Sequence, residues 1–116
     1  MMIKTKKEIK EEYKSRKTRA GIYQIKNQSE NRIFLNFTFD ADRAFNLDQF
    51  SLRINSHLNK KLQTDWNQLG ADAFTFEFID ELEISETASQ SDIRVELKEL
   101  LLMHQNRLKE SGTILY

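Results

Sequence analysis

The sequence predicts an α+β fold in which a small three-stranded sheet, mixed or antiparallel, is flanked by helices. Two short apolar runs, 21–25 and 33–37, flank a polar break and indicate a β-hairpin. Residues 73–79 alternate, with phenylalanines at every second position, which is typical of a strand with one buried face. Apolar residues at helical spacing in three further segments predict the helices.

The chain length of 116 residues suits one domain with a single modest core. We expect residues 1–116 to form that domain, with a basic N-terminal helix at 1–19, a core at 20–110 and a tail at 111–116. The sequence has no cysteine, which excludes disulfides, thiolate metal sites and cysteine nucleophiles. No apolar stretch approaches the length of a membrane span, so we expect a cytoplasmic protein with no membrane partner.

Charge is unevenly distributed although the net charge is zero. Residues 1–20 carry eight Lys or Arg against three Glu, whereas residues 71–100 carry nine acidic side chains against two basic ones. A basic helix can contact a phosphate backbone, and the acidic half would be repelled by it. The alternative interpretation is a solvated amphipathic helix with a salt-bridged surface.

The first helix of the core is expected at 41–54, with Asp40 as its N-cap. Its apolar residues recur at helical spacing and predict a buried stripe: Ala44, Leu47, Phe50 and Ile54.

A second helix is expected at 57–69, recapped by Asn55 and Ser56 and closed by Gly70. The acidic, Ser/Thr-rich segment 80–91 is expected to be a loop. The final helix is expected at about 91–109. Its apolar stripe contains Ile93, Leu97, Leu100, Leu101, His104 and Leu108.

The hairpin and the segment after it carry a resemblance to a known family. Gly21-Ile22-Tyr23 match the first motif of the GIY-YIG nucleases, and Asn31-Arg32-Ile33 resemble the turn and basic residue before the second motif. The second motif is altered, since Phe34-Leu35-Asn36 stand in place of tyrosine, isoleucine and glycine. Residues 58–78 resemble the helix and third strand of small bacterial members. The sequence therefore resembles the GIY-YIG superfamily over most of its length.

The resemblance implies a specific hydrolytic chemistry. In this family a glutamate on a late helix holds one divalent metal, a motif tyrosine serves as or near the general base, and an arginine on the first helix stabilises the phosphorane. A developing dianionic centre needs such a metal or guanidinium. A tyrosine with its ordinary pKa of about 10 is a poor base unless a nearby cation lowers that pKa.

Several positions implied by the resemblance hold other residue types. Tyr23 matches the motif tyrosine, but Phe34 lacks the second hydroxyl. The arginine position falls on Ala44 and the nearby histidine position on Asp48. The metal glutamate position falls on Leu101, which completes an apolar stripe. We therefore expect no metal site and no cofactor.

The catalytic candidates are Tyr23 and Arg43, although Arg43 precedes the family position and would need a shift of register around the helix. The candidates for phosphate or nucleic-acid contact are Arg32, His57, Asn59, Lys60 and Lys61. His57 is expected to begin a helix, where free N–H groups favour anions.

Three functional hypotheses follow from these residues. The leading one is a GIY-YIG-like domain with an incomplete catalytic centre that survives as a nucleic-acid-binding or interaction module. The first alternative is an active structure-specific DNA endonuclease that uses Mg²⁺ or Mn²⁺ with Tyr23, Arg43 and either Glu96 or Glu99. The second is a paralogue that binds a protein partner and no nucleic acid.

Overall fold

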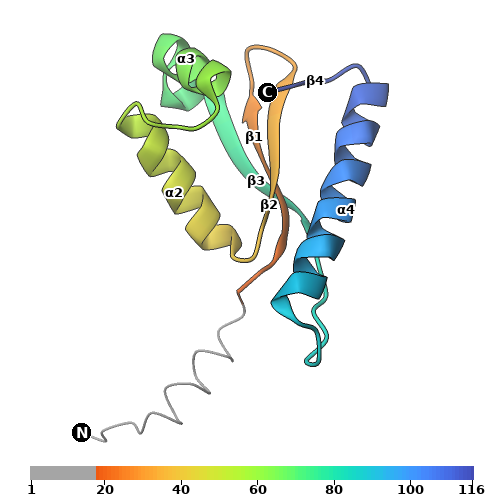
Figure 1. Cartoon of the computed structure of the whole chain (residues 1–116). Helices are drawn as coiled ribbons and strands as arrows, with labels where there is room; N and C mark the ends of the chain where they lie inside the picture. The colour runs from red at the N-terminus through yellow and green to blue at the C-terminus, as the bar shows by residue number, and fades with distance from the viewer. Residues whose placement is uncertain (1–17) are drawn as a thin grey trace, which may run out of the picture.

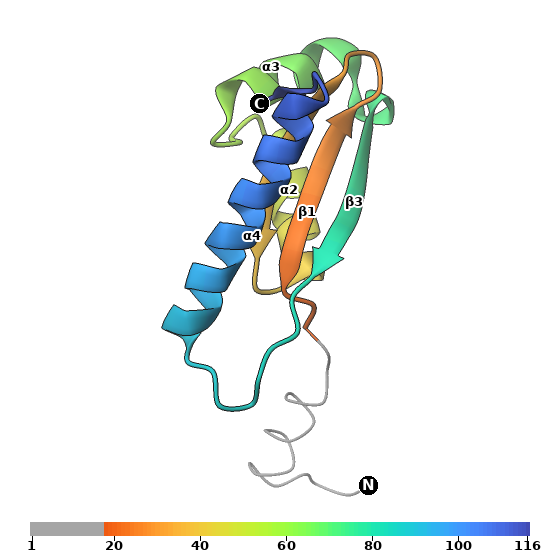
Figure 2. The ribbon, with the colours of Figure 1, turned by 90° about the vertical axis from the view of Figure 1, so that its right-hand side faces the viewer.

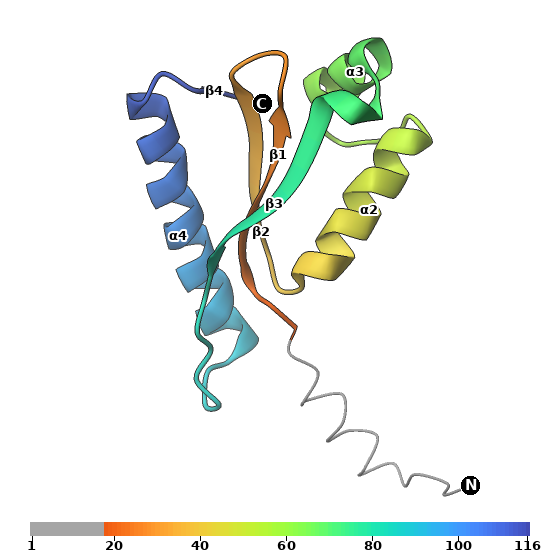
Figure 3. The ribbon, with the colours of Figure 1, turned by 180° about the vertical axis from the view of Figure 1, so that it is seen from behind.

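A four-stranded sheet with helices on both faces makes up the fold, as a computed structural model describes it for residues 18–116 (Figure 1). The strand order is β3-β1-β2-β4. Helices α2 and α3 cover one face and α4 covers the other, an arrangement that Figure 3 shows from behind. The predicted α+β class with a sheet flanked by helices is confirmed. The predicted basic helix at 1–19 lies, up to residue 17, outside the described residues.

Strand β1 (Gly21–Asn27) is central and pairs antiparallel with both β2 (Arg32–Thr38) and β3 (Phe74–Glu81). The predicted hairpin and its pairing with the later strand are therefore confirmed. Gly21 lies against the backbone of β3, because a Cβ there would overlap with the Asp80 carbonyl oxygen. Only glycine fits this position without a shift of the backbone.

The sheet has four strands rather than the predicted three, because β4 (Ile114–Leu115) forms within the predicted tail. It pairs parallel with Arg32 and Ile33 of β2. Two backbone hydrogen bonds hold it, from the Ile114 amide to the Asn31 carbonyl at 3.0 Å and from the Tyr116 amide to the Ile33 carbonyl at 3.0 Å. Within the described residues, β4 covers only the first two residues of the outer edge of β2.

The three long helices lie close to their predicted ranges. Helix α2 is Ala41–Arg53 and has the predicted N-cap, because the Asp40 side chain accepts from the Arg43 amide at 3.3 Å. Helix α3 is Lys60–Leu69 and begins later than predicted, because its N-cap is Asn59 rather than Asn55 or Ser56. A short 3₁₀ turn, η1 (Ala71–Ala73), precedes β3, and α4 is Gln90–Glu110.

Helix α2 is rotated relative to the prediction, which is the main correction to the sequence analysis. Leu47, Phe50 and Ile54 were predicted to be buried, but their exposed fractions are 53%, 58% and 54%. The side chains that are buried or half-buried recur at spacings of three and four on the opposite side: Ala41, Phe45, Asp48 and Leu52. The helix therefore turns an aspartate toward the sheet and an apolar stripe toward solvent.

Each face of the sheet has its own apolar cluster. Ile25, Leu52, Leu62 and Phe74 pack together under α2 and α3. On the other face, Ile22, Ile33, Leu35 and Leu108 form the cluster under α4, which runs along the sheet in Figure 2. Leu101, the position that the family resemblance assigns to a metal glutamate, packs against this second cluster. His104 on α4 is partly buried and reaches the Asp80 carboxylate at 2.7 Å.

Of the helices described in residues 18–116, none is both long and apolar enough to cross a membrane.

Candidate functional site

Tyr23, Asp48 and His57 form a hydrogen-bonded network on the face covered by α2 and α3. The Tyr23 hydroxyl donates to Asp48 Oδ2 at 2.6 Å, and His57 Nε2 lies 3.1 Å from Asp48 Oδ1. Tyr23 comes from the central strand, Asp48 from the inward side of α2, and His57 from the turn before α3. Tyr23 and His57 are only 3% and 4% exposed, whereas the Asp48 side chain is 17% exposed and is the member of the network that water reaches.

The partners of His57 fix its protonation pattern. The Asn59 amide donates to His57 Nδ1 at 3.0 Å, so this nitrogen is the acceptor of a neutral imidazole. The proton is therefore on Nε2, which donates it to Asp48. Both ring nitrogens are engaged, and the ring packs edge-on against Phe34 with centroids 5.3 Å apart. His57 is held as a positioning group rather than as a free acid or base.

Tyr23 is held in its protonated form. Burial raises its pKa well above the ordinary value, and the charge of Asp48 and the hydrogen bond to it raise the pKa further. A hydrogen bond from Asn36 opposes this shift but does not reverse it. A general base needs a pKa closer to the working pH, so the shift runs against that role.

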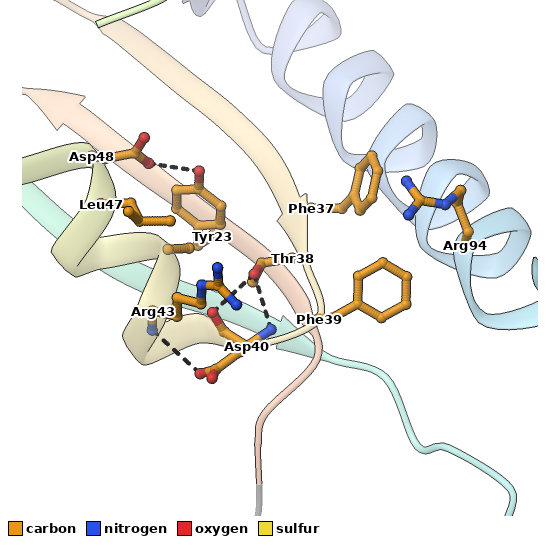
Figure 4. A pocket seen from close by; sticks show the side chains of 10 residues that line it. Tyr23, Phe37, Thr38, Phe39, Asp40, Arg43, Leu47, Asp48 and Arg94 are labelled. Atoms are coloured by element: carbon orange, nitrogen blue, oxygen red, sulfur yellow. Dashed lines mark hydrogen bonds between the residues drawn. The ribbon is translucent and has the colours of Figure 1, made fainter. Parts of the chain in front are cut away.

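A cavity of about 390 Å³ opens beside Tyr23 at the outer edge of β2, and we call it the edge cavity (Figure 4). Its lining residues come from β1, β2, the turn between β2 and α2, α2 and α4: Tyr23, Phe37, Thr38, Phe39, Asp40, Arg43, Ala44, Leu47, Asp48 and Arg94. Arg43 and Arg94 therefore approach one space from helices on opposite faces of the sheet. Within residues 18–116, neither guanidinium forms a salt bridge. Arg94 instead lies 5.2 Å from the Phe39 ring centroid.

A second cavity, of about 550 Å³, lies on the other side of Asp48, and we call it the α3 cavity. It is lined by Phe34, Asn36, Leu47, Asp48, Ser51, His57, Leu58 and Asn59. Leu47 and Asp48 border both cavities. The Asp48 carboxylate therefore places a negative charge between the two open spaces of this face.

A second tyrosine–aspartate pair lies at the middle of α3. The Tyr116 hydroxyl donates to Asp65 Oδ2 at 2.6 Å, and Lys61 Nζ lies 3.0 Å from Asp65 Oδ1. Burial alone would raise the pKa of Asp65, but the hydrogen bonds from Tyr116 and Lys61 outweigh it and hold that pKa below its ordinary value. Arg32 contributes to the lowering, and its guanidinium lies 5.4 Å from the Tyr116 ring centroid.

The structure divides the predicted site residues into three groups. Tyr23 and Arg43 line the edge cavity, while His57 and Asn59 line the α3 cavity. Asn59 also caps α3 with its side chain, which accepts from the Leu62 amide at 3.0 Å.

Arg32 and Lys61 form the third group, at Asp65, while Lys60 is exposed in the first turn of α3. The predicted phosphate contacts therefore do not converge on one surface.

The structure adds two residues to the predicted candidates. Asp48 was placed only as the occupant of a histidine position in the family, and its link to Tyr23 was not foreseen. Asp48 is spaced from Ala41 and Leu52 so that all three lie on one side of α2. This spacing is the sequence signal that would have predicted an inward-facing Asp48. Arg94 gave no signal, because α4 and β2 are far apart in the sequence.

The residues present do not fit the divalent metal that the resemblance implies. Leu101 packs in an apolar cluster at the expected ligand position. The carboxylates that line the edge cavity are already engaged: Asp40 caps α2, and Asp48 accepts from Tyr23 and His57. Among the residues that the structure describes, no three His, Asp or Glu side chains are grouped as metal ligands. Glu96 and Glu99 are exposed on α4 and line neither cavity.

The fold is similar to that of a solved nuclease domain. The catalytic domain of the homing endonuclease I-TevI matches with a TM-score of 0.53 and 27% sequence identity, over 70% of this chain and 87% of that domain. A glutamate-to-alanine mutant of the catalytic domain of the intron endonuclease I-TevI matches with a TM-score of 0.53 and 26% identity, over 71% of this chain and 84% of that one. No protein-family model matches the sequence, and no curated protein matches it.

Proposed function

Since the chain belongs to the GIY-YIG nuclease superfamily, we propose that it is a nucleic-acid-binding domain that has lost the hydrolytic step. The Tyr23–Asp48–His57 network carries this proposal. A general base in this position must take a proton from water. The Tyr23 hydroxyl is instead protonated, donates its proton in a hydrogen bond to Asp48, and has a raised pKa. The network therefore stabilises the fold where hydrolysis would need a reactive group.

The charge of Asp48 supports the same proposal. A scissile phosphate beside Tyr23 would lie close to this carboxylate, and like charges in a partly dehydrated site repel strongly. The family's arginine position is Ala44, which supplies no compensating guanidinium. A bound phosphate would therefore be kept away from Tyr23.

Arg43 and Arg94 are the groups that we propose bind nucleic acid. Both line the edge cavity and have no carboxylate partner within residues 18–116. Phe37 and Phe39 line the same space, which suits an unpaired base that stacks on an aromatic ring. We propose single-stranded or branched DNA, whose bases are accessible, as the preferred ligand.

Binding is tested by fluorescence anisotropy with labelled single-stranded, branched and duplex DNA over a range of salt. Arg43→Ala and Arg94→Ala should each weaken binding about tenfold and lower the salt slope by about one. Lys98→Ala is the matched control, because Lys98 is an exposed cation on α4 that lines neither cavity. Equal losses in all three variants would contradict a site at the edge cavity.

A second candidate, an active endonuclease, is favoured by one observation: Arg43 lines the same cavity as Tyr23. A cleavage assay with Mg²⁺ or Mn²⁺ on branched and single-stranded DNA separates the two. We expect no cutting by the unaltered protein. Metal-dependent cutting that Tyr23→Phe abolishes would establish the active enzyme and end the binding-only proposal.

Restoration tests the loss directly. Changing Phe34→Tyr, Ala44→Arg, Asp48→His and Leu101→Glu together returns four of the altered positions to the family's residue type. Cutting by this variant, checked for folding by circular dichroism, would support loss at these positions. The same variant without Leu101→Glu is the control, because it lacks the implied metal ligand.

A further inference from the structure

Helix α2 carries a second apolar stripe that nothing in the described structure covers. Leu47, Phe50 and Ile54 follow one another at spacings of three and four, and more than half of each side chain is exposed. The opposite side of the same helix is already packed on the sheet through Leu52. A helix that is apolar on both sides is typical of one that is buried on both sides.

The stripe continues beyond the end of the helix. Leu58, in the turn between α2 and α3, is 96% exposed and lines the α3 cavity together with Leu47. The four side chains Leu47, Phe50, Ile54 and Leu58 therefore form one surface, which we call the outward stripe. Patches of this kind on soluble proteins mark interaction sites.

The charges beside the outward stripe would complement the same charges of a second copy of the chain. Asp42 lies in the first turn of α2 and Arg53 in the last, and both are exposed. Because eleven residues make about three turns, the two side chains lie on the same flank of the helix. When two such helices pack antiparallel about a two-fold axis, Asp42 of each faces Arg53 of the other.

We propose that the outward stripe is the interface of a homodimer in which α2 packs antiparallel on α2 of a second copy. A two-fold interface requires one patch that complements itself. Leu47 and Phe50 lie between Asp42 and Arg53, so the apolar contact at the two-fold axis would have opposite charges on either side of it. In α2, Arg43 is the one cation in line with the stripe, one turn before Leu47, whereas a nucleic acid would favour several. The exposed apolar residues of α4 offer less, because Lys98 and Glu99 separate Val95 from Leu102.

The first test measures oligomeric state by analytical ultracentrifugation of the full chain, up to about 100 μM protomer, a range that includes micromolar dimers. The unaltered protein should be dimeric at the upper end. Phe50→Glu should raise the dimer Kd about thirtyfold or more, as for a central aromatic residue. Leu102→Glu is the matched control, because Leu102 is 57% exposed, close to the 58% of Phe50, and lies outside the stripe. A monomer throughout the range, or a dimer that only Leu102→Glu weakens, would overturn the proposal.

The second test fixes the antiparallel arrangement by charge exchange. Asp42→Arg and Arg53→Asp should each weaken the dimer about tenfold, because each places like charges opposite one another twice. The double variant Asp42→Arg with Arg53→Asp restores both pairs and should restore the dimer to within about threefold. Circular dichroism checks that α2 is intact in each variant. Losses that add up in the double variant would overturn this arrangement.

Discussion

Tyr23 and Tyr116 make the same hydrogen bond in two regions of the molecule, each donating its hydroxyl to an aspartate at 2.6 Å. The second contact of Asp65 is the ammonium of Lys61, and the Asp65 carboxylate borders neither the edge cavity nor the α3 cavity. Around Asp48, the second contact is a neutral imidazole, and both cavities are bordered. The chemistry of the pair is shared, but its surroundings are not.

Only one of these two similar pairs is available for function. The charge of Asp65 is balanced by the Lys61 ammonium, and its hydrogen bond from Tyr116 anchors the C-terminal residue to α3. Asp65 is therefore fully engaged in contacts within the fold. Among residues 18–116, Asp48 receives hydrogen bonds but forms no ion pair with a lysine or arginine, so its charge acts on whatever enters the cavities. A buried aspartate beside an open space is therefore the better functional candidate, although it is the less stabilising one.

The largest expected effect is on stability at the compensated pair. Asp65→Ala should lower the free energy of unfolding by about 3 kcal/mol, because it leaves the partly buried Tyr116 hydroxyl without its acceptor and removes the ion pair with Lys61. Asp48→Ala should cost about 1–2 kcal/mol, since its two neutral donors, Tyr23 and His57, each line a cavity from which water can replace the lost acceptor. Urea unfolding followed by the fluorescence of Trp66 measures both. A larger loss at Asp48 would reverse the assignment of structural and functional roles.

The next effect is the response to alkaline pH. The pKa values of Tyr23 and Tyr116 are both raised in the folded state, mainly by burial. Their contribution to stability is therefore complete below the unfolded pKa of about 10 and is lost as pH rises above it, at up to about 1.4 kcal/mol per pH unit for each tyrosine.

Urea unfolding at several values between pH 9 and pH 11 measures this slope. Tyr23→Phe and Tyr116→Phe should each make the slope shallower, because each removes one tyrosine that ionises in the unfolded chain. A slope unchanged by both substitutions would contradict the buried, protonated state of the two hydroxyls.

The smallest effect is on nucleic-acid affinity. Asp48→Asn removes one negative charge beside the edge cavity and should tighten DNA binding about three- to tenfold at low salt, with the gain falling as salt screens it. Asp72→Asn is the matched control, because Asp72 is exposed in η1, lines neither cavity and changes the net charge equally. The same gain in both variants would show that net charge alone, and not the place of Asp48, governs affinity.

Local sequence signals predicted most of the fold. The hairpin, the strand that follows α3 and the Asp40 cap each depend on residues close together in the chain, and each is confirmed. The short strand β4 could not be predicted, because its pairing with Arg32 and Ile33 depends on where α4 delivers the chain. The start of α3 was misplaced because three polar residues, Asn55, Ser56 and Asn59, are all good caps and only Asn59 is used.

The candidate site was harder to predict than the fold, for two physical reasons. Helix α2 carries apolar side chains on two sides, and the more apolar stripe through Phe50 is the one that the sequence predicts to be buried, whereas the structure buries the stripe through Leu52. This choice also decides that Asp48 meets Tyr23. The edge cavity depends further on Arg94, which only the three-dimensional packing of α4 brings beside β2.

The central place of β1 also sets an order of events during folding. Tyr23 pairs with Asn36 across a short turn, but with Phe78 only after the intervening helices have returned the chain. Closing a hairpin takes microseconds. The pairing of β1 with β3 closes a longer loop, and so loses more chain entropy before its contacts form. The hairpin is therefore the natural nucleus, and the docking of β3 is the slow step. Substitutions in the hairpin should slow refolding, while those in β3 should mainly speed unfolding.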